Sequence, residues 1–391
     1  MPIMNKTIIL LDLISHENMH IPFNEGYLRV MRNAFPNDEI IFAATAGHID
    51  NMDANLSEDF NITMKKTANL RDHLNGHSPH SPLYSLRSSK KCWNDLLALS
   101  SNKTIRSVSI LGAVGPLIHS FSTRWNRKFS GHLHFIQHDQ FARAAAWRSR
   151  NPITKYFDYL SVLGRGLPER QKLIVLELGL KDLLSQYAPK LTRSIVTVEH
   201  PVLESEWLEA KPFDKSKPIT VGFVGHCGVG KGFDTFLALA EKFSGDKYQF
   251  YAIGKNNIQP EDNISFDGLT VLPANRYLPR ADFIDLLNQV DIVCLPLPAK
   301  TSFVSSGSII DAFAGLKPLI ITENQSLIAI QEKYGNYGEI VKDQAALEHF
   351  FEKFDDEAFE ESYPQWHKTL LKIRNARSEQ VLGEIMAKLI S

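Results

Sequence analysis

Short apolar runs alternate with helical patterns along almost the whole chain. In the first half, the apolar runs that read as strands cover residues 6–12, 39–45, 61–64, 106–111, 133–138, 172–176 and 194–198. Between them, apolar residues recur every three or four positions, and the clearest of these patterns predict helices at residues 25–34, 89–99, 114–127 and 152–163. This alternation predicts a parallel sheet that is covered by helices.

The same alternation restarts after a polar segment that contains a proline. Residues 206–217 carry lysines, aspartate and Pro212, a composition typical of a linker. Beyond it, strands are predicted at residues 219–225, 249–253, 291–296 and 318–322, and helices at residues 233–243, 281–289, 308–316 and 327–334. We therefore expect two doubly wound α/β domains, at residues 1–205 and 218–363.

The last helical pattern, residues 364–390, follows the final predicted strand. It has no neighbouring strand left to cover. We therefore expect the segment 364–391 to pack outside its own domain.

Composition supports a folded protein with more than one domain. The 391 residues exceed the ~250–300 at which a single hydrophobic core stops growing. Hydrophobic residues make up 43% and charged residues 22%, and the net charge of −1 gives no electrostatic reason to expect nucleic acid. The three scattered cysteines fit a reducing compartment, and no run of ~18 apolar residues predicts a membrane span, so we expect a cytoplasmic location.

Residues 225–232 resemble a phosphate-binding loop. The segment Gly-His-Cys-Gly-Val-Gly-Lys-Gly follows a strand and precedes a helix, and it matches seven of the eight positions of G-x-x-x-x-G-K-[ST]. The eighth residue, Gly232, has no hydroxyl for Mg²⁺, and Asp291 begins its strand instead of ending it. The glycines and Lys231 still favour a phosphate-bearing ligand, while a plain strand-to-helix turn is the alternative.

A second segment with small polar residues precedes the helix predicted at residues 308–316. Ser305, Ser306, Gly307 and Ser308 can offer hydroxyls and backbone amides to an anion. Asp311 follows about one turn later, where its carboxylate can accept hydrogen bonds from ribose hydroxyls. An ordinary serine-rich helix start is the alternative for this segment.

Two such loops in one domain, together with a second domain of similar architecture, resemble the GT-B glycosyltransferases and among them glycosyltransferase family 4 (glycosyl transferases group 1). The similar segments are residues 225–232, 291–296 and 311–318. The resemblance implies two Rossmann-like domains that face each other across a cleft, with a nucleotide sugar bound to the C-terminal one. The residues that it assigns to the donor are His226, Gly230, Lys231, Ser305, Ser306, Gly307, Ser308 and Asp311.

The N-terminal half carries weaker matches to the same family. Glu25 and Gly26 follow the first strand, where the family places a glycine-bearing loop near the donor phosphates. His138 and Asp139 end a strand and look like the family's His-Asp pair at the sugar site. The C-terminal segment 364–391 looks like the helix that returns to the N-terminal domain in these enzymes.

Two positions depart from the family pattern. Retaining family 4 enzymes carry two glutamates eight positions apart, whereas this chain has Asp311 at the second position and Phe303 at the first. His226 stands where the family usually has arginine. Retention and inversion both stay open, and an inverting reaction needs a general base, for which Asp139 and Glu25 are the candidates.

Residues 121–172 combine positive charge with aromatic side chains. Ten Lys and Arg stand against three acidic residues there, and the aromatic residues interleaved with them include Phe121, Trp125, Phe141, Trp147, Tyr156 and Phe157. This combination suits the anionic headgroups of a membrane or a diphosphate-linked lipid acceptor. A basic solvated face above aromatic core residues is the alternative.

The sequence therefore predicts a glycosyltransferase that moves a sugar from a UDP- or GDP-type donor to a carbohydrate or lipid-linked carbohydrate acceptor, in polysaccharide or glycan assembly. Neither metal nor other cofactor is expected, because Lys231 and helix N-termini can neutralise the leaving diphosphate. The alternatives are a P-loop-like nucleotide triphosphatase or kinase and a non-catalytic GT-B-like partner subunit.

Overall fold

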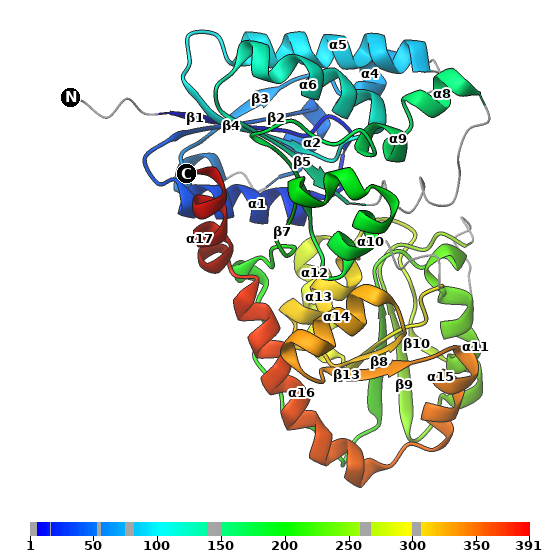
Figure 1. The fold of residues 1–391 in the computed structure, drawn as a ribbon. Helices are drawn as coiled ribbons and strands as arrows, with labels where there is room; N and C mark the ends of the chain where they lie inside the picture. Colours follow the sequence, from blue (N-terminus) through cyan, green and yellow to red (C-terminus); the bar gives the residue numbers. More distant parts are fainter. Residues whose placement is uncertain are drawn as a thin grey trace. The chain divides into compact units, whose positions relative to one another are not determined.

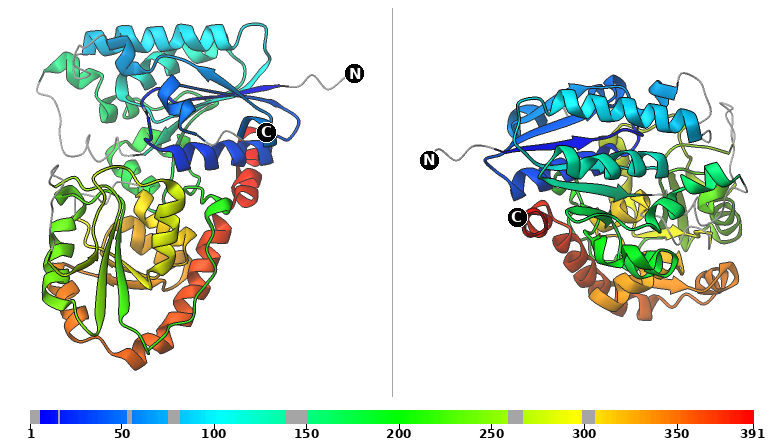
Figure 2. Two further views of the ribbon diagram at one scale, coloured as in Figure 1. Left: turned by 180° about the vertical axis from the view of Figure 1, so that it is seen from behind. Right: turned by 45° about the horizontal axis from the view of Figure 1, so that its top comes forward.

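The computed structural model describes residues 6–15, 17–52, 56–74, 82–138, 151–258, 267–298 and 306–391. The described chain forms two compact units. The first contains residues 1–201 and 378–391, and the second contains residues 202–302 and 306–377. Each unit consists of one parallel sheet with helices around it, as Figures 1 and 2 show, so the predicted α/β fold class is confirmed.

The sheet of the first unit has seven parallel strands in the order β3-β2-β1-β4-β5-β6-β7. The strands are β1 (Thr7–Leu11), β2 (Glu39–Ala44), β3 (Ile62–Lys66), β4 (Ile105–Leu111), β5 (His132–Gln137), β6 (Gln171–Val175) and β7 (Ile195–Thr197). The helices are α1 (Ile21–Ala34), α2 (Ala46–Asp50), α3 (Leu56–Asp59), α4 (Leu70–Leu74), α5 (Pro82–Leu99), α6 (Gly115–Lys128), α8 (Pro152–Tyr156), α9 (Tyr159–Leu163), α10 (Leu180–Tyr187), the 3-10 turn η1 (Pro189–Ser194) and α17 (Glu379–Ile390).

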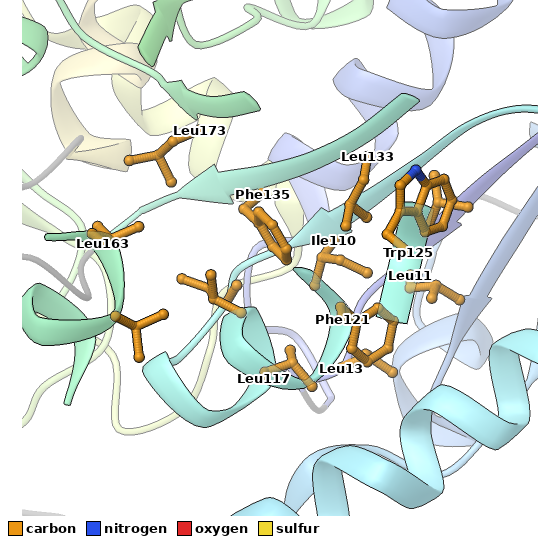
Figure 3. Close-up of a cluster of buried hydrophobic side chains, with 14 of the residues drawn as sticks. Leu11, Leu13, Ile110, Leu117, Phe121, Trp125, Leu133, Phe135, Leu163 and Leu173 are labelled. Carbon is orange, nitrogen blue, oxygen red and sulfur yellow. The ribbon is translucent and has the colours of Figure 1, made fainter. Parts of the chain in front are cut away.

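Side chains alternate between the two faces of this sheet and fill two cores. Leu11 of β1 faces a core that contains residues of α5, α6, α9 and α10, and Figure 3 shows Phe121, Trp125 and Phe135 in it. Leu10, the preceding residue, faces the second core together with residues of α1 and α17. Because successive strand residues point to opposite faces, the nearly continuous apolar runs match a sheet that is buried on both sides.

The C-terminal helix α17 packs against α1 of the first unit. Leu382 and Met386 of α17 are buried in the same core as Tyr27, and Figure 1 shows the two helices side by side. A Cβ at Gly383 would lie 2.9 Å from the Cβ of Asn33, so α17 approaches α1 closely there. The expected return of the C-terminal segment to the N-terminal fold is confirmed for residues 378–391, whereas residues 364–377 of the same segment belong to the second unit.

The sheet of the second unit has six parallel strands in the order β10-β9-β8-β11-β12-β13. The strands are β8 (Ile219–Val224), β9 (Tyr248–Ile253), β10 (Leu269–Val271), β11 (Ile292–Leu295), β12 (Leu319–Thr322) and β13 (Gly338–Val341). The helices are the 3-10 turns η2 (Glu204–Glu206) and η3 (Val229–Lys231), and α11 (Phe233–Phe243), α12 (Arg280–Gln289), α13 (Gly307–Ala314), α14 (Gln325–Tyr334), α15 (Gln344–Glu352) and α16 (Asp356–Ala376).

The segment expected as a linker, residues 206–217, lies within the second unit. The backbone N–H of Leu208 donates to Ala314 O, and the N–H of Val202 donates to Arg377 O. This polar segment therefore belongs to the start of the second unit.

Two predicted helices are wrong in their extent. Residues 152–163 form α8 and α9, because the carboxylate of Asp158 accepts the N–H of Ser161 and starts a new helix. Residues 364–390 form parts of α16 and α17, since Ser378 caps α17 in the same way. Pro364 lies inside α16, which begins eight residues earlier behind the capping residue Asp355.

Among the described residues, no helix combines the length and the apolar character that a membrane crossing needs.

Candidate functional site

The candidate residues gather at the carboxyl ends of the strands in both sheets. The chain reverses its direction of winding between β1 and β4 in the first sheet and between β8 and β11 in the second. Ligands of open α/β sheets bind outside the carboxyl ends of the strands at this point. Each unit therefore has one place where the topology favours a site.

In the second unit, the loop after β8 uses two glycines in left-handed conformations. Gly225, directly after β8, has φ +100°, and Gly232, directly before α11, has φ +78°. The 3-10 turn η3 lies between them and ends at Lys231. The phosphate-loop-like segment is therefore a turn that passes from strand to helix with Lys231 near its end.

Three further segments meet this loop. A Cβ on Gly225 would lie 2.4 Å from Ser308 Oγ, and a Cβ on Gly254 would lie 1.7 Å from Gly225 O. A Cβ on Gly232 would lie 1.8 Å from Pro296 O. The loops after β8, β9 and β11 and the start of α13 thus pack together, so the structure joins the two candidate phosphate segments.

The N-terminus of α13 offers hydrogen-bond donors beside open space. Ser306 is the N-cap residue, is 5% exposed, and its Oγ has no hydrogen-bond partner among the described residues. No atom of the described residues lies within 4 Å of the positions that a Cβ would take at Gly307 and at Gly230. A buried polar group without a partner is costly, and the first amides of a helix attract anions, so this arrangement suits a phosphate group.

Positive charge surrounds the loop after β8. The pKa of His226 is lowered by partial burial and by the charges of Lys231 and Lys255. Asn257 Nδ2 lies 2.7 Å from His226 Nδ1 and can donate to it, which also favours the neutral ring. The ring of Tyr277 contacts His226 edge-on at 5.5 Å between centroids and lies 4.7 Å from Lys255 Nζ.

Asp311, the expected ribose ligand, lies in α13 and is bound by an arginine. Its Oδ1 accepts a hydrogen bond of 2.6 Å from Arg280 Nη2. Burial raises the pKa of the Asp311 carboxyl, and Arg280 opposes this shift. Arg280 could not be identified from the sequence, because a contact between residues 31 positions apart leaves no local pattern.

In the first unit, His138 follows β5 and is enclosed by aromatic rings. The ring of His20 stacks on it at 4.6 Å, and Phe23 contacts it edge-on at 4.3 Å. Burial, together with His20 and His200, holds the pKa of His138 well below its ordinary value. His138 is therefore a neutral imidazole near pH 7, which can exchange hydrogen bonds with a sugar but binds a proton weakly.

A buried polar network follows β1 and β2. Asp12 Oδ1 accepts the backbone N–H of Ser15 at 2.8 Å, and Asp12 Oδ2 accepts from Asn24 Nδ2 at 2.7 Å. The same Nδ2 lies 2.8 Å from His48 Nε2, while His48 Nδ1 lies 2.9 Å from Glu17 O. Since a carbonyl oxygen can only accept, His48 carries its proton on Nδ1 and accepts from Asn24.

The expected loop at Glu25 and Gly26 is wrong. Both residues lie inside α1, which begins at Ile21 behind the N-cap residue His20. Pro22 near the start of α1 favours this early beginning. Backbone N–H groups in the first turn of a helix make no hydrogen bond within the helix, so the N–H that proline lacks is not needed there. Gly26 therefore forms no part of a loop, and Glu25 is 9% exposed on the buried side of the helix.

Asp139, Phe303 and Ser305 lie outside the described residues. Further residues at the carboxyl edges were not predicted from the sequence: Asp12, His20, His48, His200, Lys255, Tyr277 and Arg280. Asp12 and Lys255 closely follow strands, and this position could have identified them. The remaining residues come from helix starts and loops with no distinctive pattern.

No protein-family model matches the chain, and no curated protein matches it in sequence. Solved structures match its fold. A glycosyltransferase from Rickettsia africae has a TM-score of 0.65 at 12% identity, over 99% of this chain and 98% of that one. HepE from Anabaena, solved in complex with UDP and glucose, has a TM-score of 0.62 at 10% identity, over 98% and 99%.

The same fold also occurs in a proposed UDP-N-acetylglucosamine 2-epimerase from Listeria monocytogenes. The TM-score is 0.55 at 10% identity, over 98% of this chain and 95% of that one. Four further structures with this fold are described as two glycosyltransferases, a galactosyltransferase and a glycotransferase. The chain has the GT-B fold.

Proposed function

We propose that the protein is a glycosyltransferase that binds a nucleoside diphosphate sugar at the carboxyl edge of the second sheet. The observation that carries this proposal is the meeting of two phosphate-binding features. The N-terminus of α13 brings the buried hydroxyl of Ser306, which has no hydrogen-bond partner within the described part of the chain, and the loop after β8 brings Lys231. The start of α13 carries a partial positive charge and Lys231 carries a full one, and both favour a bound phosphate.

A diphosphate leaving group can be stabilised here by the protein alone. Lys231, the amides at the start of α13 and the nearby Lys255 supply positive charge in a preorganised setting. Such groups act where negative charge develops in the transition state. We therefore expect donor binding and turnover to continue when divalent metal is removed.

Lys231→Ala is expected to weaken nucleoside diphosphate binding about ten- to a hundredfold, since a charge-assisted contact contributes roughly 1.5–3 kcal/mol. The change opens no core cavity, because Lys231 lies in the loop η3 outside the sheet. Calorimetric titration measures the effect. Lys372→Ala, an exposed lysine on α16, is the matched control. Equal affinities of the Lys231 variant and wild type would remove Lys231 from the site.

The first unit is proposed to bind the sugar and the acceptor. His138 packs with the rings of His20 and Phe23 at the carboxyl edge of its sheet, in an aromatic and polar cluster in which His138 and Phe23 are buried. Neutral imidazoles and aromatic faces suit the hydroxyls and C–H faces of carbohydrates. We propose a carbohydrate or lipid-linked carbohydrate as the acceptor.

A P-loop nucleotide triphosphatase is disfavoured by two positions. Gly232 has no room for the side chain of the motif's serine or threonine, because a Cβ there would collide with Pro296 O. Asp291 lies at the amino end of β11, where its Oδ2 accepts the N–H of Thr220 at 2.8 Å. This carboxylate is therefore at the edge of the sheet opposite the loop and cannot hold a metal there.

A screen of nucleotides by thermal unfolding tests donor binding. We expect one of UDP, GDP and ADP to raise the melting temperature in the presence of EDTA, by an amount that grows with its concentration. Stabilisation by ATP with Mg²⁺ alone would support a nucleotide triphosphatase. Absence of stabilisation by every nucleotide would support a non-catalytic partner subunit.

We also propose that the first unit contacts an anionic membrane at the cytoplasmic face. Phe121 and Trp125 are fully buried, so neither residue belongs to the proposed membrane-facing surface. Ile153 and Tyr156 of α8 are 55% and 50% exposed, and the guanidinium of Arg165 lies 4.1 Å from the Tyr156 ring centroid. Exposed apolar side chains beside basic ones are typical of interfacial contacts.

The double variant Ile153→Ser/Tyr156→Ser is expected to bind vesicles of phosphatidylglycerol and phosphatidylcholine roughly three- to tenfold more weakly than wild type. Cosedimentation measures the bound fraction. Tyr187→Ser, which changes a tyrosine of similar exposure on α10, is the control. Equal binding of the double variant and wild type would show that α8 is an ordinary solvated surface.

A further inference from the structure

Three charged side chains from separate segments form one cluster beside the proposed donor site. Arg280, the first residue of α12, donates from Nε to Glu206 Oε1 at 2.6 Å and from Nη2 to Glu206 Oε2 at 2.5 Å. The same Nη2 donates to Asp311 Oδ1 at 2.6 Å. Glu206 comes from η2 and Asp311 from α13, so Arg280 links the two carboxylates.

The guanidinium of Arg280 is held in a fixed orientation. Its bidentate contact with Glu206 uses the planar fork of the arginine, and its Cζ lies 4.7 Å from the ring centroid of Phe283. The side chain of Glu206 is 13% exposed and that of Arg280 is 36% exposed. A guanidinium with these neighbours presents Nη2 to Asp311 in one geometry.

The charge of the cluster leaves Asp311 able to accept further hydrogen bonds. One arginine faces two carboxylates, so the cluster has an excess of negative charge. The hydrogen bond from Arg280 reaches Oδ1 of Asp311, and the Asp311 side chain keeps 15% of its surface exposed. A carboxylate with this surplus charge and partial exposure suits neutral hydroxyl donors.

Asp311 lies one helical turn after the start of α13. Asp311 follows Gly307 by four residues and Ser308 by three, so the three lie on one face of the helix, about one turn apart. Ser308 in turn lies against Gly225 of the loop after β8. A nucleoside diphosphate whose phosphates lie at the start of α13 would bring its ribose toward Asp311.

We propose that Arg280 is a positioning residue, which together with Glu206 orients the Asp311 carboxylate toward ribose hydroxyls and so makes the site selective for ribonucleotides. This inference rests on the proposed function. Arg280 acts through Asp311 and makes no contact with the diphosphate. Without Arg280, the carboxylates of Asp311 and Glu206 would be partly buried, unpaired and mutually repulsive, and Asp311 would turn away or take up a proton.

Arg280→Met is expected to bind the nucleoside diphosphate about ten- to a hundredfold more weakly than wild type. The probe is whichever of UDP, GDP and ADP binds wild type most tightly. Its 2′,3′-dideoxy analogue has no ribose hydroxyls, and wild type and Arg280→Met should bind this analogue equally. Arg280→Lys keeps a positive charge but cannot make the bidentate contact of the guanidinium, and it should lose less affinity for the nucleoside diphosphate than Arg280→Met. In the background of Asp311→Asn, Arg280→Met should cause no further loss.

Lys317→Met provides a matched control at the other end of α12. Lys317 is 3% exposed, and its Nζ donates to Val290 O at 2.6 Å, directly after the helix. This variant disturbs the anchoring of α12 without touching either carboxylate, so its affinity for both probes should equal that of wild type. Thermal unfolding of every variant reports whether the fold is intact.

Equal affinity of Arg280→Met and wild type for the ribonucleotide would overturn the inference while the proposed function stands. An equal loss for the ribonucleotide and its dideoxy analogue would also overturn it, since a merely structural role predicts that result. If Arg280→Met does not fold, Arg280→Lys and Glu206→Gln must show the same selective loss. A wild-type protein that binds none of the three diphosphates would contradict the proposed function and this inference with it.

Discussion

Replacing Gly232 by serine is expected to destabilise the second unit, although the change completes the phosphate-loop pattern. Gly232 has φ +78°, a conformation that costs other residues ~1–2 kcal/mol. A Cβ would also lie 1.8 Å from Pro296 O, so the backbone of two loops must separate. We expect the free energy of unfolding to fall by more than ~3 kcal/mol and the melting temperature to fall by roughly 5–10 °C.

Scanning calorimetry of Gly232→Ser measures this loss. Gly230→Ser is the matched control, because Gly230 lies in the same loop, has no positive φ and has open space around its Cβ position. We expect the control to unfold within about 1 kcal/mol of wild type. A Gly232→Ser protein of normal stability that hydrolyses ATP with Mg²⁺ would show that the loop is a P-loop with one altered residue.

His138→Ala is expected to reduce turnover of the nucleotide sugar by about 10²–10⁴-fold and to leave nucleoside diphosphate binding unchanged. The imidazole follows β5 in the first unit, whereas the proposed diphosphate ligands all belong to the second. Its low pKa keeps it neutral, so its contribution is hydrogen bonding to reacting hydroxyls. Such contacts act mainly in the transition state and therefore affect the rate more than donor affinity.

The rate of nucleoside diphosphate release measures this effect. His138→Asn is the second variant, since it fills more of the space between His20 and Phe23 than alanine does. His132→Ala, at the amino end of β5, is the matched control and should turn over at the wild-type rate. A His138 variant with the wild-type rate would place the chemistry elsewhere.

The strands of the central sheets were predictable because burial on both faces leaves continuous apolar runs. Sequence and structure agree within two residues for β1, β2, β8 and β9. The edge strands β10 and β13 were missed, because they are short and only partly buried, so their apolar pattern is weak. The pattern of burial, more than strand propensity, decided which strands could be found.

Helix boundaries were less predictable, because single polar residues set them. Asp158 and Ser378 each start a new helix within a continuous apolar periodicity. A helix cap depends on the side-chain oxygen of one polar residue, whereas the helix prediction used only the spacing of apolar residues. The early start of α1 at Ile21 also moved Glu25 and Gly26 from an expected loop into a helix.

The candidate donor site was predictable as two separate segments, while its contacts were not. The segments at Lys231 and Ser306 were recognisable from glycine and serine before helices. Their meeting depends on the close approach of Gly225 to Ser308, and the pairing of Asp311 with Arg280 depends on a neighbouring helix. Roles in donor binding and catalysis remain predictions for each of these residues.

The most direct test of the central claim is the release of nucleoside diphosphate from a panel of UDP-, GDP- and ADP-sugars in the presence of EDTA, with the sugar followed by NMR. The account predicts that one donor releases its nucleoside diphosphate without metal and that the sugar leaves the nucleotide, to water or to an added acceptor. A sugar that changes its configuration at C2 while still attached to the nucleotide would instead identify an epimerase. Absence of release from every donor, with hydrolysis of ATP in the presence of Mg²⁺, would contradict the account.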